Sequence, residues 1–451
     1  MKIKLLYYFL TSVLYGIFSF IDIKYAVFVF IILMCIALVF EEFKNFVIIF
    51  LFLSMFLIPL WVNSYGLFGI SFGIIKINYP LIGLVLAFIA VIGRGFTKKN
   101  SWTNVDKLVL LFFVYVSLSI ITKNTTETLG SSYVVIFPFL FYFLFVFSRN
   151  IYRPYDIFYL LNVLLIALVV EGLLFIIMYI LKYSPFAEPI EIYGKTTDYI
   201  FLQVFQPVGA SGPAEMGYFF TIGILISYML YKTTMKTLYL WGSYFFIIAL
   251  FATVSRLPLF IGILCLIIVT IRSIKFKHGL VVLALVFSTF IAILYTGTLD
   301  LLVKGIYERS SQEIFLTDLE QRWYFTVPPV IYYLSSDFRN LLFGAGYQLF
   351  RQMPFGSVPH NIFLAQAADF GLVGLLLMLS LFYSIIKYVR RSKTSGILKS
   401  QLGKIIIYSI FIWIINGFVQ YAAHSFLFYT FIFLLFNFFI VMEAEKNNII
   451  E

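Results

Sequence analysis

The chain has 451 residues, of which 62% are hydrophobic and 20% aromatic, while only 12% are charged. Soluble globular proteins carry about 25% charged residues, so this composition excludes a soluble domain and predicts a polytopic membrane protein. The net charge of +11 indicates basic cytoplasmic loops rather than binding to nucleic acid. Cys35 and Cys265 both lie in apolar runs, so neither a disulfide framework nor a thiolate metal site is expected.

Apolar segments recur along the whole chain. Each has about 15–25 residues, the length at which a helix crosses a hydrocarbon core of about 30 Å. We therefore expect an all-α fold in which residues 1–451 form a single bundle of about 14 (12 to 14) transmembrane helices. The segments lie near residues 5–20, 25–40, 46–62, 78–93, 108–122, 132–148, 157–181, 217–231, 238–254, 257–271, 279–295, 361–386, 405–422 and 425–442.

The distribution of Lys and Arg predicts the orientation of this bundle. With the amino terminus inside, 21 of the 32 basic residues fall on the inner side, and five of the other 11 lie in one long loop at 296–360. Long loops carry little topological signal, so the contrast in the short loops is 21 against 6. We therefore expect both termini to be cytoplasmic and the 296–360 loop to be external.

The external loop at 296–360 is the longest polar stretch of the chain. Thr317 and Glu320 have the spacing of a capping box, which predicts a short helix that starts at Asp318. This helix should end or kink near Pro328-Pro329, since proline interrupts a helix interior. The loop is therefore expected to contain short helices.

Two arginines are candidate anion-binding residues. Arg322 would project from the first turns of the loop helix, and its alternative is a surface charge paired with Asp318. Arg256 follows Ser255 in a tight break between two apolar segments. A snorkelling interfacial cation is the ordinary interpretation of Arg256, but a Ser-Arg pair at a helix break can also present a fork of donors to phosphate oxygens.

His360 is a candidate general base. With Ser357 or Val358 as the helix cap and Pro359 in the first turn, His360 is predicted to lie within the first turn of the next span. The helix dipole disfavours imidazolium there, which leaves a neutral imidazole to accept a proton. The alternative is a purely structural histidine.

Two carboxylates, Glu171 and Asp369, are further candidate functional residues. Glu171 lies deep in a predicted span, where ionisable residues are suspected of function, and it favours a transporter as a rival hypothesis. Asp369 follows His360 by nine residues, which places it on the opposite face of a continuous helix, so no His–Asp dyad is expected. The sequence shows neither a Gly-rich phosphate loop nor metal-ligand spacing.

Five motifs follow one another over roughly residues 205–385. They are Gly209 before Gly212-Pro213, Ser255-Arg256, Arg322-Trp323, the turn Gly344-Ala345-Gly346, and His360-Asn361 followed by Asp369 and Gly371. In this order they resemble the Gly-rich segment, Ser-Arg element, loop arginine, Gly-x-Gly turn and His-Asn element of the O-antigen ligase and O-antigen polymerase (Wzy-type) superfamily. The chain departs from the family pattern at Gln206, often a basic residue there, and at Leu257, usually glycine.

The resemblance implies a glycosyltransferase of the bacterial inner membrane that needs no metal or cofactor. Its donor would be an undecaprenyl-diphosphate-linked oligosaccharide at the outer face, with His360 as base and Arg256 and Arg322 stabilising the diphosphate leaving group. Substrate binding is expected at Asn361, Ser255, Gly344, Gly346 and Gly209. Expected partners are membrane lipid, a chain-length regulator and a flippase, and no nucleic acid.

Several functions remain open at this point. We favour a polymerase of capsule or lipopolysaccharide O-antigen type, because the departures at Gln206 and Leu257 suit a divergent branch. A ligase that transfers the glycan to lipid A core is the first alternative. A lipid-linked sugar flippase or transporter, with Glu171 and Arg256 along its path, is another, although the internal repeat that such proteins show was not found. A membrane acyltransferase using His424 or His360 is a third.

Overall fold

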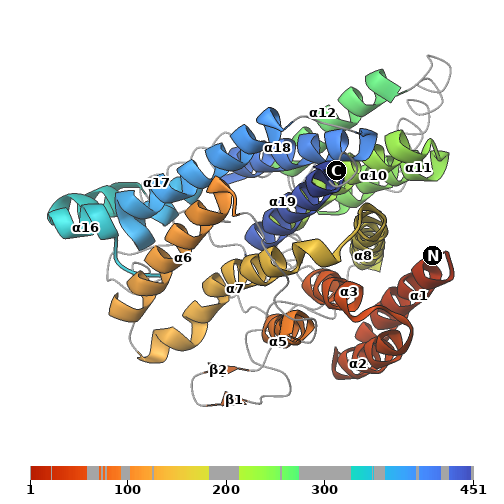
Figure 1. The fold of residues 1–451 in the computed structure, drawn as a ribbon, viewed down its shortest axis with the longest axis horizontal. Helices are drawn as coiled ribbons and strands as arrows, with labels where there is room; N and C mark the ends of the chain where they lie inside the picture. The colour runs from red at the N-terminus through yellow and green to blue at the C-terminus, as the bar shows by residue number, and fades with distance from the viewer. Residues whose placement is uncertain are drawn as a thin grey trace.

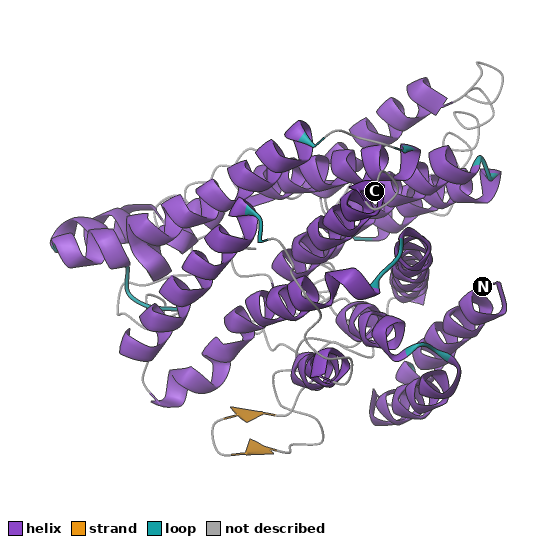
Figure 2. Cartoon of the chain, viewed as in Figure 1, coloured by secondary structure: helices purple, strands orange, loops and turns teal. Residues whose placement is uncertain are grey.

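The computed structural model shows a predominantly helical chain (Figure 1, Figure 2). It describes residues 2–21, 23–57, 71–72, 75–76, 79–92, 102–123, 126–181, 213–253, 256–273, 327–347, 349, 361–392, 396–417 and 426–447. Two strands of two residues each, β1 (Ser71–Phe72) and β2 (Ile75–Lys76), pair antiparallel. The expectation of a helical fold is confirmed.

The helices follow the apolar segments closely. They are α1 (Lys2–Ser19), α2 (Ile23–Phe40), α3 (Phe43–Leu57), α5 (Tyr79–Ile92), α6 (Asn104–Lys123), α7 (Thr126–Ser148), α8 (Pro154–Leu181), α10 (Pro213–Thr234), α11 (Thr237–Ala252), α12 (Arg256–Ser273), α16 (Phe338–Phe343), α17 (Ile362–Arg391), α18 (Ile397–Gly417) and α19 (Phe426–Asn447). A 3₁₀ turn, η2 (Arg149–Ile151), joins α7 to α8, and a further helix covers 327–336. The segment predicted at 279–295 lies outside the described residues.

Four of the described helices are long and apolar enough to cross a membrane. They cover Asn104–Lys123, Pro154–Met178, Ile362–Arg391 and Ile397–Gly417. Large apolar side chains are also exposed on the outside of the bundle, for example Phe28 at 58% and Leu118 at 56%. Contiguous exposed apolar surface is rare on soluble monomers, so the fold is that of a helical membrane protein.

The helices pack as one bundle around a shared apolar core. α6 lies along α17, α7 lies along α19, and α10 contacts α11, α12 and α18 (Figure 1). α8 and α10 both begin at a proline, Pro154 and Pro213, which suits a first helical turn because its N–H groups have no partner within the helix. Aromatic rings such as the stacked Trp413 and Phe428, with centroids 4.1 Å apart, fill the contact between α18 and α19.

A buried ion pair joins several helices at one end of this bundle. Arg149 donates two hydrogen bonds to Asp106, Nη2 to Oδ1 at 2.7 Å and Nη1 to Oδ2 at 3.0 Å. Its Nε also donates to Asn437 of α19 at 2.7 Å, and the Tyr142 hydroxyl donates to Asp106. All four residues are less than 9% exposed, so α6, α7 and α19 are fixed to one another by a satisfied polar network.

Further ion pairs lie at the same end of the bundle. Lys44 donates to Asp156 of α8 at 2.7 Å, and Lys4 contacts Glu41 at 3.3 Å. At the far side of α19, Lys399 lies 3.4 Å from Glu443. The start of α1 and the end of α19 therefore belong to the same end, which we call the charged end. Which side of the membrane the charged end faces stays a prediction.

Candidate functional site

The motif residues that the structure describes lie at the other end of the bundle. α6 makes this clear, because Asp106 is in its first turn and Lys123 is its last residue. At a rise of about 1.5 Å per residue, these two residues are about 25 Å apart along the helix. The carbonyl of Gly344 accepts a hydrogen bond from the Lys123 ammonium group, so Gly344 lies at the Lys123 end of α6. We call this the motif end.

The break that contains Arg256 is confirmed. α11 ends at Ala252 and α12 begins at Arg256. The start of α12 packs tightly on α10, since a Cβ on Gly217 would lie 2.6 Å from the Cβ of Pro258. The Thr221 hydroxyl also donates to the Pro258 carbonyl at 3.3 Å. The first turn of α12 is thereby fixed beside the first turns of α10.

The start of α10 is in turn linked to the start of α17 through α18. The Tyr218 hydroxyl of α10 donates to the Ser409 carbonyl of α18 at 3.0 Å. Near the end of α18, a Cβ on Gly417 would lie 2.4 Å from Cγ2 of Ile362, the first residue of α17. Only glycine allows this approach. The helix starts marked by Arg256 and Ile362 are therefore at the same end of the bundle.

Asn361 is the cap of α17. Its side-chain oxygen accepts from the backbone N–H of Phe363 at 2.9 Å and of Leu364 at 3.2 Å. The prediction that Ser357 or Val358 caps the helix, with His360 in its first turn, is therefore wrong. Asn is among the best N-cap residues, and it satisfies two free N–H groups at once. His360 immediately precedes this cap in the chain.

The Gly344-Ala345-Gly346 turn is fastened to α17. The N–H groups of Ala345 and Gly346 donate to the carbonyls of Ala368 and Asp369, both at 2.8 Å. α17 is interrupted just beyond these two carbonyls, at Gly371, whose φ is 66° and ψ −171°. The face relation expected between His360 and Asp369 assumed that both residues lie in one helix, whereas α17 begins at Ile362 with Asn361 as its N-cap.

Two side chains of α6 complete this junction. Lys123 donates to the carbonyls of Phe343 and Gly344, each at 2.6 Å. The Tyr115 hydroxyl donates to the carbonyl of Phe370. The turn, the interruption in α17 and the end of α6 are thus joined mainly through backbone carbonyls. Sequence reasoning missed Lys123 and Tyr115, because neither stands in a motif.

The described part of the 296–360 loop, which the sequence predicts to be external, contains two short helices before the Gly344 turn. Pro328 and Pro329 lie in the first turn of the 327–336 helix, so they open a helix that the sequence did not predict, in keeping with their missing N–H groups. Asp337 then caps α16 by accepting from Arg339 N, and the Tyr333 hydroxyl donates to Asn340 at 3.1 Å. Burial, and then the Asp337 carboxylate, raise the pKa of Tyr333 above its ordinary value.

Several candidate residues fall outside what the structure describes. These are His360, Arg322, Ser255, Gly209 and the side chain of Arg256. The predicted helix start at Asp318 also lies outside the described residues. The roles proposed for these residues stay predictions, whereas the placement of Asn361, Gly344 and Gly346 at one end is observed.

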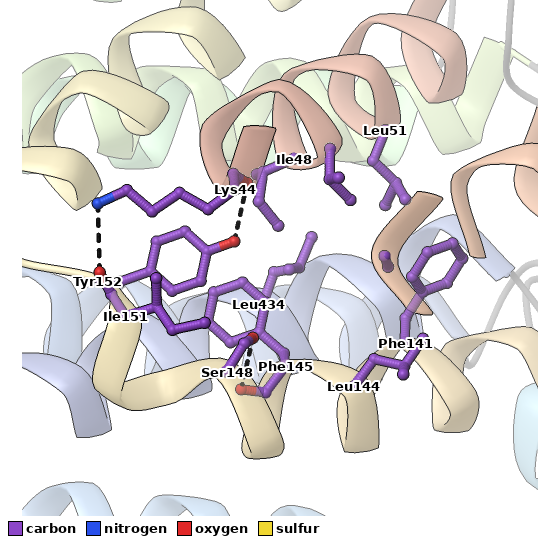
Figure 3. Close-up of a pocket in the computed structure, with 12 residues that line it drawn as sticks. Lys44, Ile48, Leu51, Phe141, Leu144, Phe145, Ser148, Ile151, Tyr152 and Leu434 are labelled. Atoms are coloured by element: carbon purple, nitrogen blue, oxygen red, sulfur yellow. Dashed lines mark hydrogen bonds between the residues drawn. The ribbon is translucent and has the colours of Figure 1, made fainter. Parts of the chain in front are cut away.

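A small cavity lies at the charged end, away from the motif residues. Figure 3 shows Lys44 and Tyr152 at one side of it and apolar side chains such as Leu51 and Phe141 around the rest. Its volume is about 30 Å³, which is room for about one water molecule. The cavity is therefore too small for a sugar or a diphosphate. Within the described ranges, no cluster of three His, Cys, Asp or Glu side chains could hold a metal ion.

Glu171 is fully buried in α8, with 0% of its surface exposed. Neither carboxylate oxygen has a hydrogen-bond partner in the described part of the chain. The position is therefore as unusual as the sequence indicated. Its neighbour Gly172 faces α11, where an added Cβ would lie 2.9 Å from Phe245.

The sequence was also compared with known proteins. No protein-family model matches the chain, and no curated protein matches it.

Proposed function

We propose that the chain is a membrane glycosyltransferase that polymerises oligosaccharide repeats carried on undecaprenyl diphosphate. What supports this is one spatial relationship. The helix headed by Arg256 and the helix capped by Asn361, directly after His360, begin at the same end of the bundle and are linked through α10 and α18. A base and a guanidinium group brought to one membrane face suit glycosyl transfer from a lipid diphosphate.

The proposed reaction is a single displacement at the anomeric carbon. An acceptor sugar hydroxyl attacks this carbon while His360 takes its proton. The bond from the anomeric carbon to the diphosphate oxygen breaks, and its electron pair leaves with the diphosphate. Arg256 and Arg322 stabilise the negative charge that develops there. Two guanidinium groups supply the charge neutralisation that a divalent cation would otherwise provide.

The charged end is proposed to face the cytoplasm and the motif end the outer face of a bacterial inner membrane. Basic residues are concentrated in cytoplasmic loops, and the predicted inner set includes Lys4, Lys44, Arg149 and Lys399, which the structure gathers at the charged end. The fourteen spans remain part of this proposal.

The decisive experiment substitutes the three proposed catalytic residues one at a time. Arg256→Ala, Arg322→Ala and His360→Ala should each reduce chain elongation by about 10²-fold or more, measured as polymer length and as lipid-linked single repeats in membranes. Arg256→Lys should also fail, because lysine lacks the planar fork of donors. Normal polymer in all three alanine variants, at normal protein levels, would overturn the proposal.

Matched controls are available in the same chain. Arg339→Ala removes an exposed arginine from the described part of the external loop, and His278→Ala removes a histidine on the predicted inner side. Both variants should polymerise the glycan to normal length. The same gels separate the two glycosyltransferase functions. Loss of a polymerase leaves single repeats, whereas loss of a ligase leaves full-length polymer on the lipid carrier.

One observation favours a second candidate function. Glu171 is a buried carboxylate without a partner among the described residues, and such groups within a membrane commonly mark transport paths. A flippase or transporter of lipid-linked sugars is therefore the alternative, and substitution of Glu171 tests it.

A further inference from the structure

A group of buried polar side chains at the motif end has no hydrogen-bond partner in the described part of the chain. Its members are the Ser409 hydroxyl, the Trp413 indole N–H, the Asn416 amide and the Tyr429 hydroxyl. Each residue is at most 6% exposed. A buried donor or acceptor left without a partner costs about 1–3 kcal/mol, so four such groups together call for an explanation.

These groups share one stripe of the bundle. Ser409, Trp413 and Asn416 are spaced by four and three residues, which places them on one face of α18. Tyr429 of α19 packs against this face, with its ring centroid 6.1 Å from that of Trp413. The stripe is continuous with the candidate site, because Gly417 follows Asn416 and packs on Ile362 at the start of α17.

The chemistry of the group indicates a neutral ligand. An indole N–H donates, an amide both donates and accepts, and hydroxyls do either, and none of the four side chains is charged. The rings of Phe382 and Phe428 lie beside Trp413, at centroid distances of 5.2 and 4.1 Å. Polar atoms between aromatic rings match a hydroxyl-bearing sugar ring, whereas a diphosphate requires cations.

We propose that Ser409, Trp413, Asn416 and Tyr429 form a sugar-binding subsite of this end of the bundle, which holds the acceptor glycan. This assignment to the acceptor rests on the proposed glycosyltransferase function. The side chains are covered in the described conformation, so a sugar reaches them when the facing ends of α18 and α19 separate. Hydroxyl groups of the sugar then supply the partners that the four side chains lack.

The first measurement concerns the free protein. Tyr429→Phe removes a hydroxyl without a partner, so the melting temperature of the purified full-length protein in lipid nanodiscs should stay the same or rise. Tyr142→Phe is the matched control, because its hydroxyl donates to Asp106, and it should melt at a lower temperature. If both substitutions lower the melting temperature equally, the Tyr429 hydroxyl already has a partner and the subsite is refuted.

The second measurement concerns binding. The probes are methyl glycosides of glucose, galactose, mannose and N-acetylglucosamine, with inorganic pyrophosphate as the charged control, all in nanodiscs free of sugar-headed detergent. At least one glycoside should raise the melting temperature of the wild type by about 1–2 °C. Asn416→Leu and Tyr429→Phe should abolish this shift and leave the pyrophosphate shift unchanged.

The outcomes separate this proposal from the function on which it rests. The subsite is overturned if no glycoside raises the melting temperature of the wild type, or if Asn416→Leu and Tyr429→Phe show the same shift as the wild type. This holds even if Arg256→Ala and His360→Ala block elongation. If the glycoside shift depends on Asn416 and Tyr429 while Arg256→Ala and His360→Ala still make normal polymer, the sugar-binding subsite stands and the glycosyl-transfer mechanism is refuted.

Discussion

Gly344 and Gly371 meet backbone to backbone, although they are 27 positions apart in the sequence. A Cβ on Gly344 would lie 2.5 Å from the nitrogen of Gly371, and a Cβ on Gly371 would lie 2.2 Å from the carbonyl oxygen of Leu342. Both glycines also have positive φ angles, 67° and 66°. The Gly-x-Gly turn and the interruption in α17 are therefore two halves of a single joint.

This joint predicts that Gly344→Ala and Gly371→Ala are each destabilising by about 3 kcal/mol or more, because backbone atoms on both sides must move. Thermal unfolding of the purified protein measures the loss. Gly396→Ala is the matched control, since Gly396 has a φ of 93° but nothing within 4 Å of an added Cβ. Gly396→Ala should lower the free energy of unfolding only by the cost of placing alanine at a positive φ, about 1–3 kcal/mol. Equal losses at the three positions would show that contact between the two segments contributes nothing.

The Asp106–Arg149 pair predicts a strong dependence of stability on both partners. Asp106→Leu or Arg149→Met alone should lower the free energy of unfolding by about 3–5 kcal/mol, because each leaves a buried charge without its partner. The double variant Asp106→Leu with Arg149→Met should recover much of the loss. A double-mutant cycle in thermal unfolding measures the coupling. Additive losses would contradict an interaction between the two side chains.

Substitution of Glu171 should change the free energy of unfolding in the opposite direction. Glu171→Met should raise the free energy of unfolding by about 1–3 kcal/mol, because it removes buried polar atoms without partners. Glu41→Met is the control, since the buried Glu41 accepts from Tyr159 at 2.6 Å and contacts Lys4, and it should destabilise the protein. Glu171→Met and Glu171→Gln should both retain chain elongation. Loss of elongation in both variants at full protein level would instead support the transporter hypothesis.

The proposed orientation predicts which cysteines react from outside the cell. In a chain with Cys35→Ser and Cys265→Ser, Ser335→Cys lies in the 327–336 helix of the loop predicted to be external, and Lys236→Cys lies between α10 and α11. Both positions are exposed. A membrane-impermeant maleimide should label Ser335→Cys in intact spheroplasts and Lys236→Cys only after permeabilisation. The opposite pattern would invert the proposed topology and place the proposed active site on the cytoplasmic face.

The positions of the helices could be predicted because their apolar runs are long. Thirteen of the fourteen predicted segments overlap a described helix, while four of the described helices satisfy the length and composition of a span. The break before Arg256 was also predictable, since Ser255-Arg256 interrupts two apolar runs. Helix ends were less certain. The sequence near α17 contains Ser357, Pro359 and Asn361, all suited to a helix start, and only the hydrogen bonds of Asn361 show which one caps it.

The candidate site was predictable as a set of residues but not as an arrangement. Gly344 and Gly346 were recognised as a turn, yet nothing local indicates that its N–H groups bond to Ala368 and Asp369. Lys123, Trp413 and Asn416 stand outside every motif. Their importance follows from neighbours that are distant in the chain, which single-sequence patterns do not encode.

The sequence by itself determined that this is a helical membrane protein and where most of its helices run. These properties follow from composition and local spacing, because the cost of burying charge and backbone in a bilayer acts on each segment separately. Only the tertiary structure decided that Arg149 pairs with Asp106, that the Gly344 turn docks on the interruption at Gly371, and that the start of α12 and the start of α17 share one end. Those relationships depend on close packing between distant segments, where one added methyl group decides whether two backbones can meet.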